Sequence, residues 1–139
     1  MEEKEPKITG VGGIFFKCDN PKALREWYGS TFGLDYNDYG IQFQSRSLEN
    51  PEQKEYLQWS SFSKDSDYMQ KEYMINYRVQ NIEKLIENMR AAGVTFCDEL
   101  ETYEYGKFIH VLDPEGNKME LWEPIDTIFT SDDEKDKKD

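Results

Sequence analysis

Apolar residues recur along this chain in two patterns: short runs in which apolar and polar residues alternate, and longer stretches in which apolar residues repeat with a period near four. The run ITGVGGIFFK at residues 8–17 predicts a strand. Asp19 or Asn20 can cap a following helix that has Pro21 in its first turn and ends at Gly33. This helix presents one apolar stripe, made of Leu24, Trp27, Tyr28 and Phe32. Three further strands are predicted, at residues 34–38, 41–45 and 56–62.

The same order of elements recurs after a polar segment at residues 63–72. A strand at 73–79 precedes a helix at 81–93, whose apolar stripe consists of Ile82, Leu85, Ile86 and Met89. Three strands follow, at residues 94–97, 107–112 and 118–123. We therefore predict a single domain at 8–125 that contains two βαβββ modules, 8–62 and 73–125, joined by the linker 63–72. Residues 1–7 are an N-terminal extension, and 126–139 are an acidic, solvated tail without a chemical function.

Spacing within the modules supports an internal repeat. When Gly12 is aligned with Met74, the two helix starts align as well. Gln58 then corresponds to Glu120, and 46 positions separate the first-strand site from the last-strand site in both modules. The same shift in residue number therefore aligns both the first strands and the last strands of the two modules, as expected after an internal duplication.

The last two predicted strands form a hairpin. DPEGN is a strong turn signal, because Pro114 presets its backbone and Gly116 tolerates the left-handed conformation. The loop this implies places His110, the only histidine, directly opposite Glu120. Alternation divides the hairpin into an aliphatic face that a helix would cover and a second face that would line a concavity. The second face carries Phe108, His110, Glu120 and Trp122.

By the repeat, the first module should present an equivalent inward face. Its residues are Tyr56, Gln58, Ser60 and Phe62, and the first strand of the second module adds Met74, Asn76 and Arg78. This mixture of aromatic and polar side chains is typical of a small-ligand pocket, although an aromatic core has the same sequence pattern. A guanidinium on an inward face needs an anionic partner, so we expect Arg78 to meet either Glu120 or a ligand carboxylate.

Charge narrows the choice of partner. The formal net charge of −12 disfavours nucleic acids and anionic membranes as partners and is compatible with a neutral or cationic small ligand. No apolar run is long enough to span a membrane, and the N-terminus has no signal-peptide core, so we expect a cytoplasmic protein. Cys18 and Cys97 lie far apart, and we expect two reduced thiols in buried strands.

Three segments together resemble a known family. GGIFFKCDNPKALREWYGSTFGL, MINYRVQNIEKLIENMRAAGV and FIHVLDPEGNKMELWEP are similar to the opening strand and helix, the start of the second module and the closing hairpin of the vicinal oxygen chelate superfamily. That superfamily includes glyoxalase I, bleomycin-resistance proteins and extradiol dioxygenases, and this chain is most similar to glyoxalase-like members of unassigned activity. The resemblance implies an α+β fold in which two βαβββ modules form curved mixed sheets around a cavity, with the helices outside. It also implies a homodimer, with the modules paired within one chain or between chains.

The resemblance also defines four positions at which metal-using members carry their ligands. Carried over by the spacing above, these positions are Gly12, Gln58, Met74 and Glu120. Glycine has no side chain, a thioether is a poor ligand for hard or borderline metal ions, and an amide is a weak one. His110 beside Glu120 still leaves fewer than the usual three protein ligands, so we expect no metal cofactor.

These residues favour a metal-free protein that binds a small organic ligand in an aromatic and polar cavity. The expected ligand-binding residues are Tyr56, Gln58, Phe62, Met74, Arg78, Phe108, His110, Glu120 and Trp122. The alternative is a glyoxalase-like lyase or isomerase in which His110 or Glu120 moves a proton alpha to a carbonyl. The same two residues also fit a purely structural role, in which His110 and Glu120 satisfy each other's hydrogen-bonding groups across the strands beneath a cavity. A third interpretation is an interaction subunit whose cavity is filled by side chains.

Overall fold

The computed structural model describes residues 4–125; the predicted tail and the first three residues lie outside the described part. The strands are β1 (Lys7–Cys18), β2 (Ile41–Arg46), β3 (Lys54–Ser63), β4 (Tyr73–Gln80), β5 (Thr95–Phe96), β6 (Glu101–Tyr103), β7 (Gly106–Leu112) and β8 (Lys118–Pro124). Two helices, α1 (Pro21–Phe32) and α2 (Ile82–Ala91), complete the described part. Neither helix is long and apolar enough to cross a membrane.

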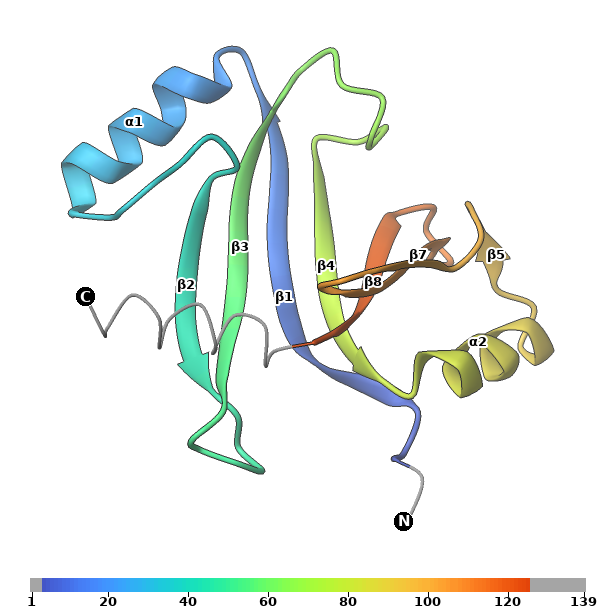
Figure 1. Ribbon diagram of the computed structural model, residues 1–139. Coiled ribbons are helices and arrows are strands. Elements are labelled where there is room, and N and C mark those ends of the chain that lie inside the picture. The colour runs from blue at the N-terminus through green and yellow to red at the C-terminus, as the bar shows by residue number, and fades with distance from the viewer. Residues whose placement is uncertain (1–3, 126–139) are drawn as a thin grey trace.

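All eight strands belong to one mixed sheet. Its order is β2-β3-β1-β4-β8-β7-β5, and β6 pairs with the far side of β7. The pairs β1–β3 and β4–β8 are parallel, whereas β1 and β4 run antiparallel and join the two halves. The sheet curves, with α1 beside its first half and α2 beside its second (Figure 1). The predicted α+β fold with a curved mixed sheet and helices outside is confirmed.

The sequence signals at the helix ends and in the hairpin act as predicted. Asn20 caps α1 by accepting a hydrogen bond from the backbone N–H of Ala23, and Gly33 ends the helix with a φ of 70°. In the hairpin, the N–H groups of Asp113 and Gly116 donate to the carbonyls of Asn117 and Asp113, and Gly116 has a φ of 83°.

Each helix covers one region of the outer face of the sheet. The stripe of α2 packs on the aliphatic face of the β7–β8 hairpin, in a core that includes Ile82, Ile86, Ile109, Val111 and Leu121. On the other half, Tyr28 of α1 lies against Trp59 of β3, which also contacts Phe16. The opposite, concave face of the sheet therefore stays free of helices.

Two local expectations are wrong, and one strand was not predicted. Residues 34–38 form no strand; a single bridge between Asn37 and Gly40 takes its place, in a turn where Asn37 Oδ1 accepts hydrogen bonds from the backbone N–H groups of Tyr39 and Gly40. The short strand β6 has no predicted counterpart. Cys97 is an exposed free thiol rather than a buried one, because β5 ends at Phe96.

Candidate functional site

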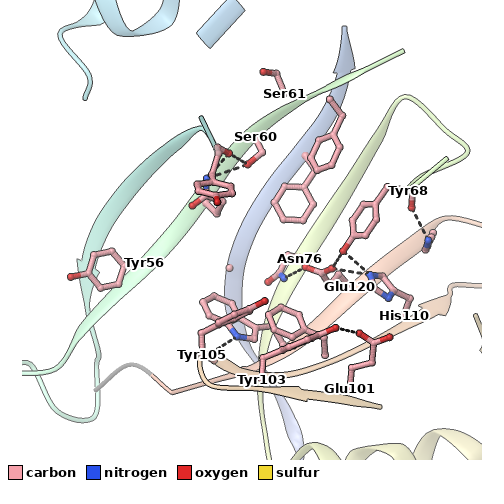
Figure 2. A pocket seen from close by; sticks show the side chains of 18 of the residues that line it. Tyr56, Ser60, Ser61, Tyr68, Asn76, Glu101, Tyr103, Tyr105, His110 and Glu120 are labelled. Carbon is pink, nitrogen blue, oxygen red and sulfur yellow. Dashed lines mark hydrogen bonds and ion pairs between the residues drawn. The ribbon is translucent and has the colours of Figure 1, made fainter. Parts of the chain in front are cut away.

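A cavity of about 940 Å³ opens on the concave face of the sheet. Seven of the nine expected ligand-binding residues line it, namely Tyr56, Gln58, Phe62, Phe108, His110, Glu120 and Trp122. The interpretation of a cavity filled by side chains is therefore wrong. Tyr56 and Ser60 lie on one wall, and Tyr68, Asn76, His110 and Glu120 gather on the other (Figure 2).

His110 and Glu120 are cross-strand partners, as predicted from the turn. His110 Nε2 lies 2.8 Å from Glu120 Oε2. On its other side, His110 Nδ1 lies 2.6 Å from Asp98 Oδ2, and the backbone N–H of His110 donates to Asp98 Oδ1 at 2.7 Å. A carboxylate on each ring nitrogen fixes the orientation of the imidazole and favours its doubly protonated form.

Tyr68 and Asn76 complete this network. The Tyr68 hydroxyl donates to Glu120 Oε2 and lies 3.1 Å from His110 Nε2. Asn76 Nδ2 donates to Glu120 Oε1 at 2.5 Å. Glu120 is only 4% exposed, so its charge is stabilised by these three neighbours instead of water (Figure 2).

The pKa values of the network follow from burial and from these hydrogen bonds. Burial lowers the pKa of His110, but its hydrogen bonds and its attraction to Glu120 and Asp98 outweigh burial and raise it above the usual value. Burial raises the pKa of Glu120, whereas hydrogen bonds from His110, Tyr68 and Asn76 lower it below the usual range. Burial first, and then the charge of Glu120, raise the pKa of the Tyr68 phenol. The network therefore favours the imidazolium form of His110 and the carboxylate form of Glu120.

Aromatic rings form the wall next to this network. Phe108 and Trp122 stack with centroids 5.8 Å apart, and Tyr103 and Tyr105 stack at 5.3 Å. Phe108 meets both tyrosine rings edge to face. The Trp122 indole N–H donates to the carbonyl of Tyr105 at 3.1 Å, which holds the wall together.

Gln58 lines the opposite side of the cavity and is held by its own neighbours. Its Nε2 donates to the carbonyl of Tyr39 at 3.0 Å and to Ser60 Oγ at 3.1 Å. Ser60 Oγ in turn donates to the same carbonyl at 2.6 Å. The Gln58 side chain is thus part of a fixed polar wall.

Met74 and Arg78 do not line this cavity. Met74 is 1% exposed and packs with Phe15 and Met69 beneath it. The expected anionic partner of Arg78 is also wrong, because its Nε pairs with Glu55 at 3.3 Å instead of with Glu120. The guanidinium of Arg78 lies over the Trp122 ring, with its carbon 5.2 Å from the ring centroid.

Comparison with known proteins identifies the family. The sequence matches the model of the Glyoxalase/Bleomycin resistance protein/Dioxygenase superfamily over residues 10–121. The chain belongs to this superfamily. No curated protein sequence matches it.

Solved structures of other superfamily members share the fold at low sequence identity. Methylmalonyl-CoA epimerase from Streptomyces coelicolor, in complex with 2-nitronate-propionyl-CoA, is 16% identical with a TM-score of 0.61 and covers 86% of this chain and 99% of its own. The Mycobacterium tuberculosis epimerase is 15% identical, with a TM-score of 0.58 and coverage of 88% and 93%. A superfamily member from Vibrio splendidus is 13% identical, with a TM-score of 0.54 and coverage of 86% and 99%. At these identities the likeness extends to the fold alone.

On β4, the residue that faces the cavity beside Glu120 is Asn76 and not Met74. Glu120 pairs with Asn76 across β4 and β8, and Asn76 lines the cavity in place of Met74. Strand β1 contains register irregularities between Ile8 and Gly13, and Gly13, not Gly12, pairs with Gln58. The cavity-lining residues at or next to the four expected positions are Gly12, Gln58, Asn76 and Glu120.

These four residues do not fit a bound metal ion. They offer one carboxylate and two amides, and both oxygens of Glu120 already accept hydrogen bonds. A Cβ at position 12 would lie 2.4 Å from Asn76 Oδ1, so Asn76 occupies the space that a side chain there would need. Within residues 4–125, no three His, Cys, Asp or Glu side chains are arranged to hold a metal.

Sequence reasoning missed Tyr68, Asp98 and the wall formed by Tyr103 and Tyr105. Tyr68 lies in the linker between the modules, and Asp98 lies in the loop after β5. Neither position has a periodic signal, because loops have no regular alternation. The aromatic spacing of Tyr103 and Tyr105 before the hairpin was the one available clue.

Proposed function

We propose that this superfamily member binds a small organic ligand in the concave cavity and does so without a metal ion. The observation that carries the proposal is that a stacked aromatic wall and the buried network around Glu120 face the same cavity of about 940 Å³. A volume near the upper end of the range for ligand sites suits a ligand with more than one ring. Aromatic walls supply contact area, and fixed polar groups orient the ligand.

Coenzyme A esters are poor candidates, although a structural neighbour was solved with one. Coenzyme A carries several phosphate charges, whereas this chain has a net charge of −12 and its cavity is lined by Asp38, Asp67, Asp98, Glu101 and Glu120.

A thermal-shift screen of neutral, cationic and anionic aromatic compounds tests the proposal. A ligand that binds only the native state raises the melting temperature by mass action. At a ligand concentration about 100-fold above Kd, the free energy of unfolding rises by about 2.7 kcal/mol. For any hit, Tyr105→Ala should weaken binding about tenfold, because the variant removes one ring of the wall. Tyr36→Ala is the matched control, because Tyr36 is as exposed as Tyr105 but lies outside the cavity.

Two results would contradict this function. One is a screen without any hit. The other is a stoichiometric Zn, Ni, Mn or Fe ion whose binding is lost in Glu120→Gln, measured by elemental analysis of protein purified without chelator.

Proton transfer is the second candidate, favoured by the short contacts of His110 with Asp98 and Glu120. In this reaction the pair takes a proton from a carbon next to a carbonyl and returns it to the product. Incubation of a hemithioacetal in D₂O should then incorporate deuterium at that carbon, detected by NMR. His110→Gln and Glu120→Gln should each slow this exchange about 100-fold or more. Unchanged exchange in both variants would exclude the pair as the proton carrier.

A further inference from the structure

The cavity wall carries more negative than positive groups. Five carboxylate residues line it, Asp38, Asp67, Asp98, Glu101 and Glu120, against two residues that can be cationic, His110 and Lys118. A cleft lined by one sign of charge, with walls of low dielectric constant, focuses the electric field into its interior. The sign of the unmatched charge therefore decides which ligands the cavity attracts.

Both cations of the wall are already held by acceptors of the protein. The Lys118 ammonium donates to the carbonyl of Tyr68 at 2.6 Å and lies 5.2 Å from the centroid of the Tyr68 ring. His110 lies between Asp98 and Glu120, so this trio carries a net negative charge even when the imidazole is protonated. Each cation of the wall thus already has an acceptor of the protein beside it.

Some hydrogen-bond acceptors of the cavity wall, in contrast, have no donor from the protein. Among residues 4–125, the carboxylates of Asp38 and Asp67 have no hydrogen-bond or ion-pair partner. The Asn76 side chain, 2% exposed at the floor of the cavity, has an Oδ1 atom that accepts no hydrogen bond. Buried polar atoms normally have partners, so this acceptor marks a place that favours a donor. The two carboxylates without a partner and Asn76 Oδ1 thus all favour a ligand that carries positive charge or N–H groups.

The aromatic wall fits the same kind of ligand. The stacked pairs Tyr103–Tyr105 and Phe108–Trp122 meet edge to face, so ring faces and ring edges border the cavity together. The face of an aromatic ring attracts cations, by about 0.5–2 kcal/mol. Glu101 lies at this wall, where it accepts a hydrogen bond from the Tyr103 hydroxyl (Figure 2). Negative charge and ring faces are therefore adjacent.

We infer that the cavity selects a flat aromatic compound that carries a positively charged amine. This inference rests on the proposed ligand-binding function and adds the charge and shape of the ligand. The rings of the ligand lie against the aromatic wall, and its ammonium group lies in the negative field set by the unpaired carboxylates.

Three naphthyl probes of matched shape test this inference on the full-length protein. They are 2-(2-naphthyl)ethylammonium, 2-(2-naphthyl)ethanol and 3-(2-naphthyl)propanoate, with charges of +1, 0 and −1. Binding is measured by calorimetry at low ionic strength and again in 0.5 M NaCl. The ammonium should bind about tenfold or more tighter than the alcohol, and the carboxylate should bind weakest. High salt should reduce the preference for the ammonium, because salt screens the field.

Two double variants test whether the preference for the ammonium probe arises in the cavity. Asp38→Asn with Asp67→Asn should weaken ammonium binding severalfold and leave alcohol binding unchanged. Asp35→Asn with Asp65→Asn removes the same charge from the same two segments, but neither residue lines the cavity, so it should change little. All four aspartates are exposed, so no variant removes a core side chain.

The possible failures are distinguishable. If no probe binds, including the alcohol, the ligand-binding function itself fails for flat aromatics. If the alcohol or the carboxylate binds as tightly as the ammonium, the charge selectivity is wrong while the binding function stands. If the two double variants lose ammonium affinity equally, the preference comes from the net charge of the protein and the assignment to the cavity is wrong.

Discussion

At the scale of single residues, the site is organised around the buried carboxylate of Glu120. A charge that is 4% exposed is stable only when neighbouring groups replace its water, and His110, Tyr68 and Asn76 do so. The His110–Glu120 contact is central to both proposed functions, because the pair lines the cavity and is the proposed proton carrier.

The His110–Glu120 pair should make stability depend on pH. The folded-state pKa of His110 is raised above its usual 6.5, so its stabilisation is complete below pH 6.5 and is lost as the pH rises through the raised value. The folded-state pKa of Glu120 is lowered from its usual 4.5, so its stabilisation is present above pH 4.5 and is lost as the pH falls through the lowered value. Both contributions are complete between pH 4.5 and 6.5.

Urea unfolding of the wild type and of His110→Gln, from pH 3 to 9, measures this dependence. The difference in unfolding free energy should be largest in the window between pH 4.5 and 6.5. NMR titration of the single imidazole gives the pKa directly. A folded-state value at or below 6.5 would contradict the expected ion pair.

Gly12 should tolerate no side chain. In Gly12→Ala the new Cβ would lie 2.4 Å from Asn76 Oδ1 and 2.9 Å from the Trp122 ring, and overpacking of this kind costs about 1–3 kcal/mol. Gly10→Ala, in the same strand, has no atom within 4 Å of the new Cβ and is the control. Urea unfolding compares the two variants, and equal stability would show that Asn76 moves aside freely.

At the scale of elements, the two ends of the sheet differ in how well a helix covers them. The stripe of α2 packs on the β7–β8 hairpin as one continuous core, and the other face of the same hairpin carries the site. The position of His110 and Glu120 therefore depends on the packing of the aliphatic residues directly behind them.

Truncation of Leu121 tests this dependence. Leu121 is 1% exposed, so Leu121→Ala should lower the unfolding free energy by about 2–5 kcal/mol. Leu48→Ala, at a leucine that is 100% exposed, should change it by less than about 0.5 kcal/mol. Chemical denaturation measures both, and a similar loss in the two variants would contradict the core assignment.

At the scale of the whole molecule, part of the outer sheet face remains apolar and uncovered. Ile14, Phe43 and Tyr73 are 40%, 41% and 55% exposed, and each pairs with an outward-facing residue of a neighbouring strand. Apolar side chains that α1 leaves open are typical of a surface that binds another protein. We propose that this face forms the homodimer expected from the family resemblance.

Sedimentation velocity tests the dimer. The wild type should sediment at twice the monomer mass, and Phe43→Glu should shift it toward monomer because a charge would be buried in the interface. Leu48→Glu adds the same charge at a fully exposed position outside this sheet face and should remain dimeric. A wild type that is monomeric at all concentrations would exclude the dimer.

The sequence by itself determined the local features of this protein. The cap of α1, the DPEGN turn, the opposition of His110 and Glu120 and the aliphatic face beneath α2 all follow from residues close together in the chain. Capping, turn chemistry and alternation act over a few residues, so they can be deduced without the fold.

Only the tertiary structure decided which distant residues complete the site. Tyr68 and Asp98 reach the pair from loops, Asn76 instead of Met74 lines the cavity, and Arg78 pairs with Glu55 on β3. These contacts depend on strand register and on loop paths, which are set by packing across the whole sheet and have no periodic signal in the sequence.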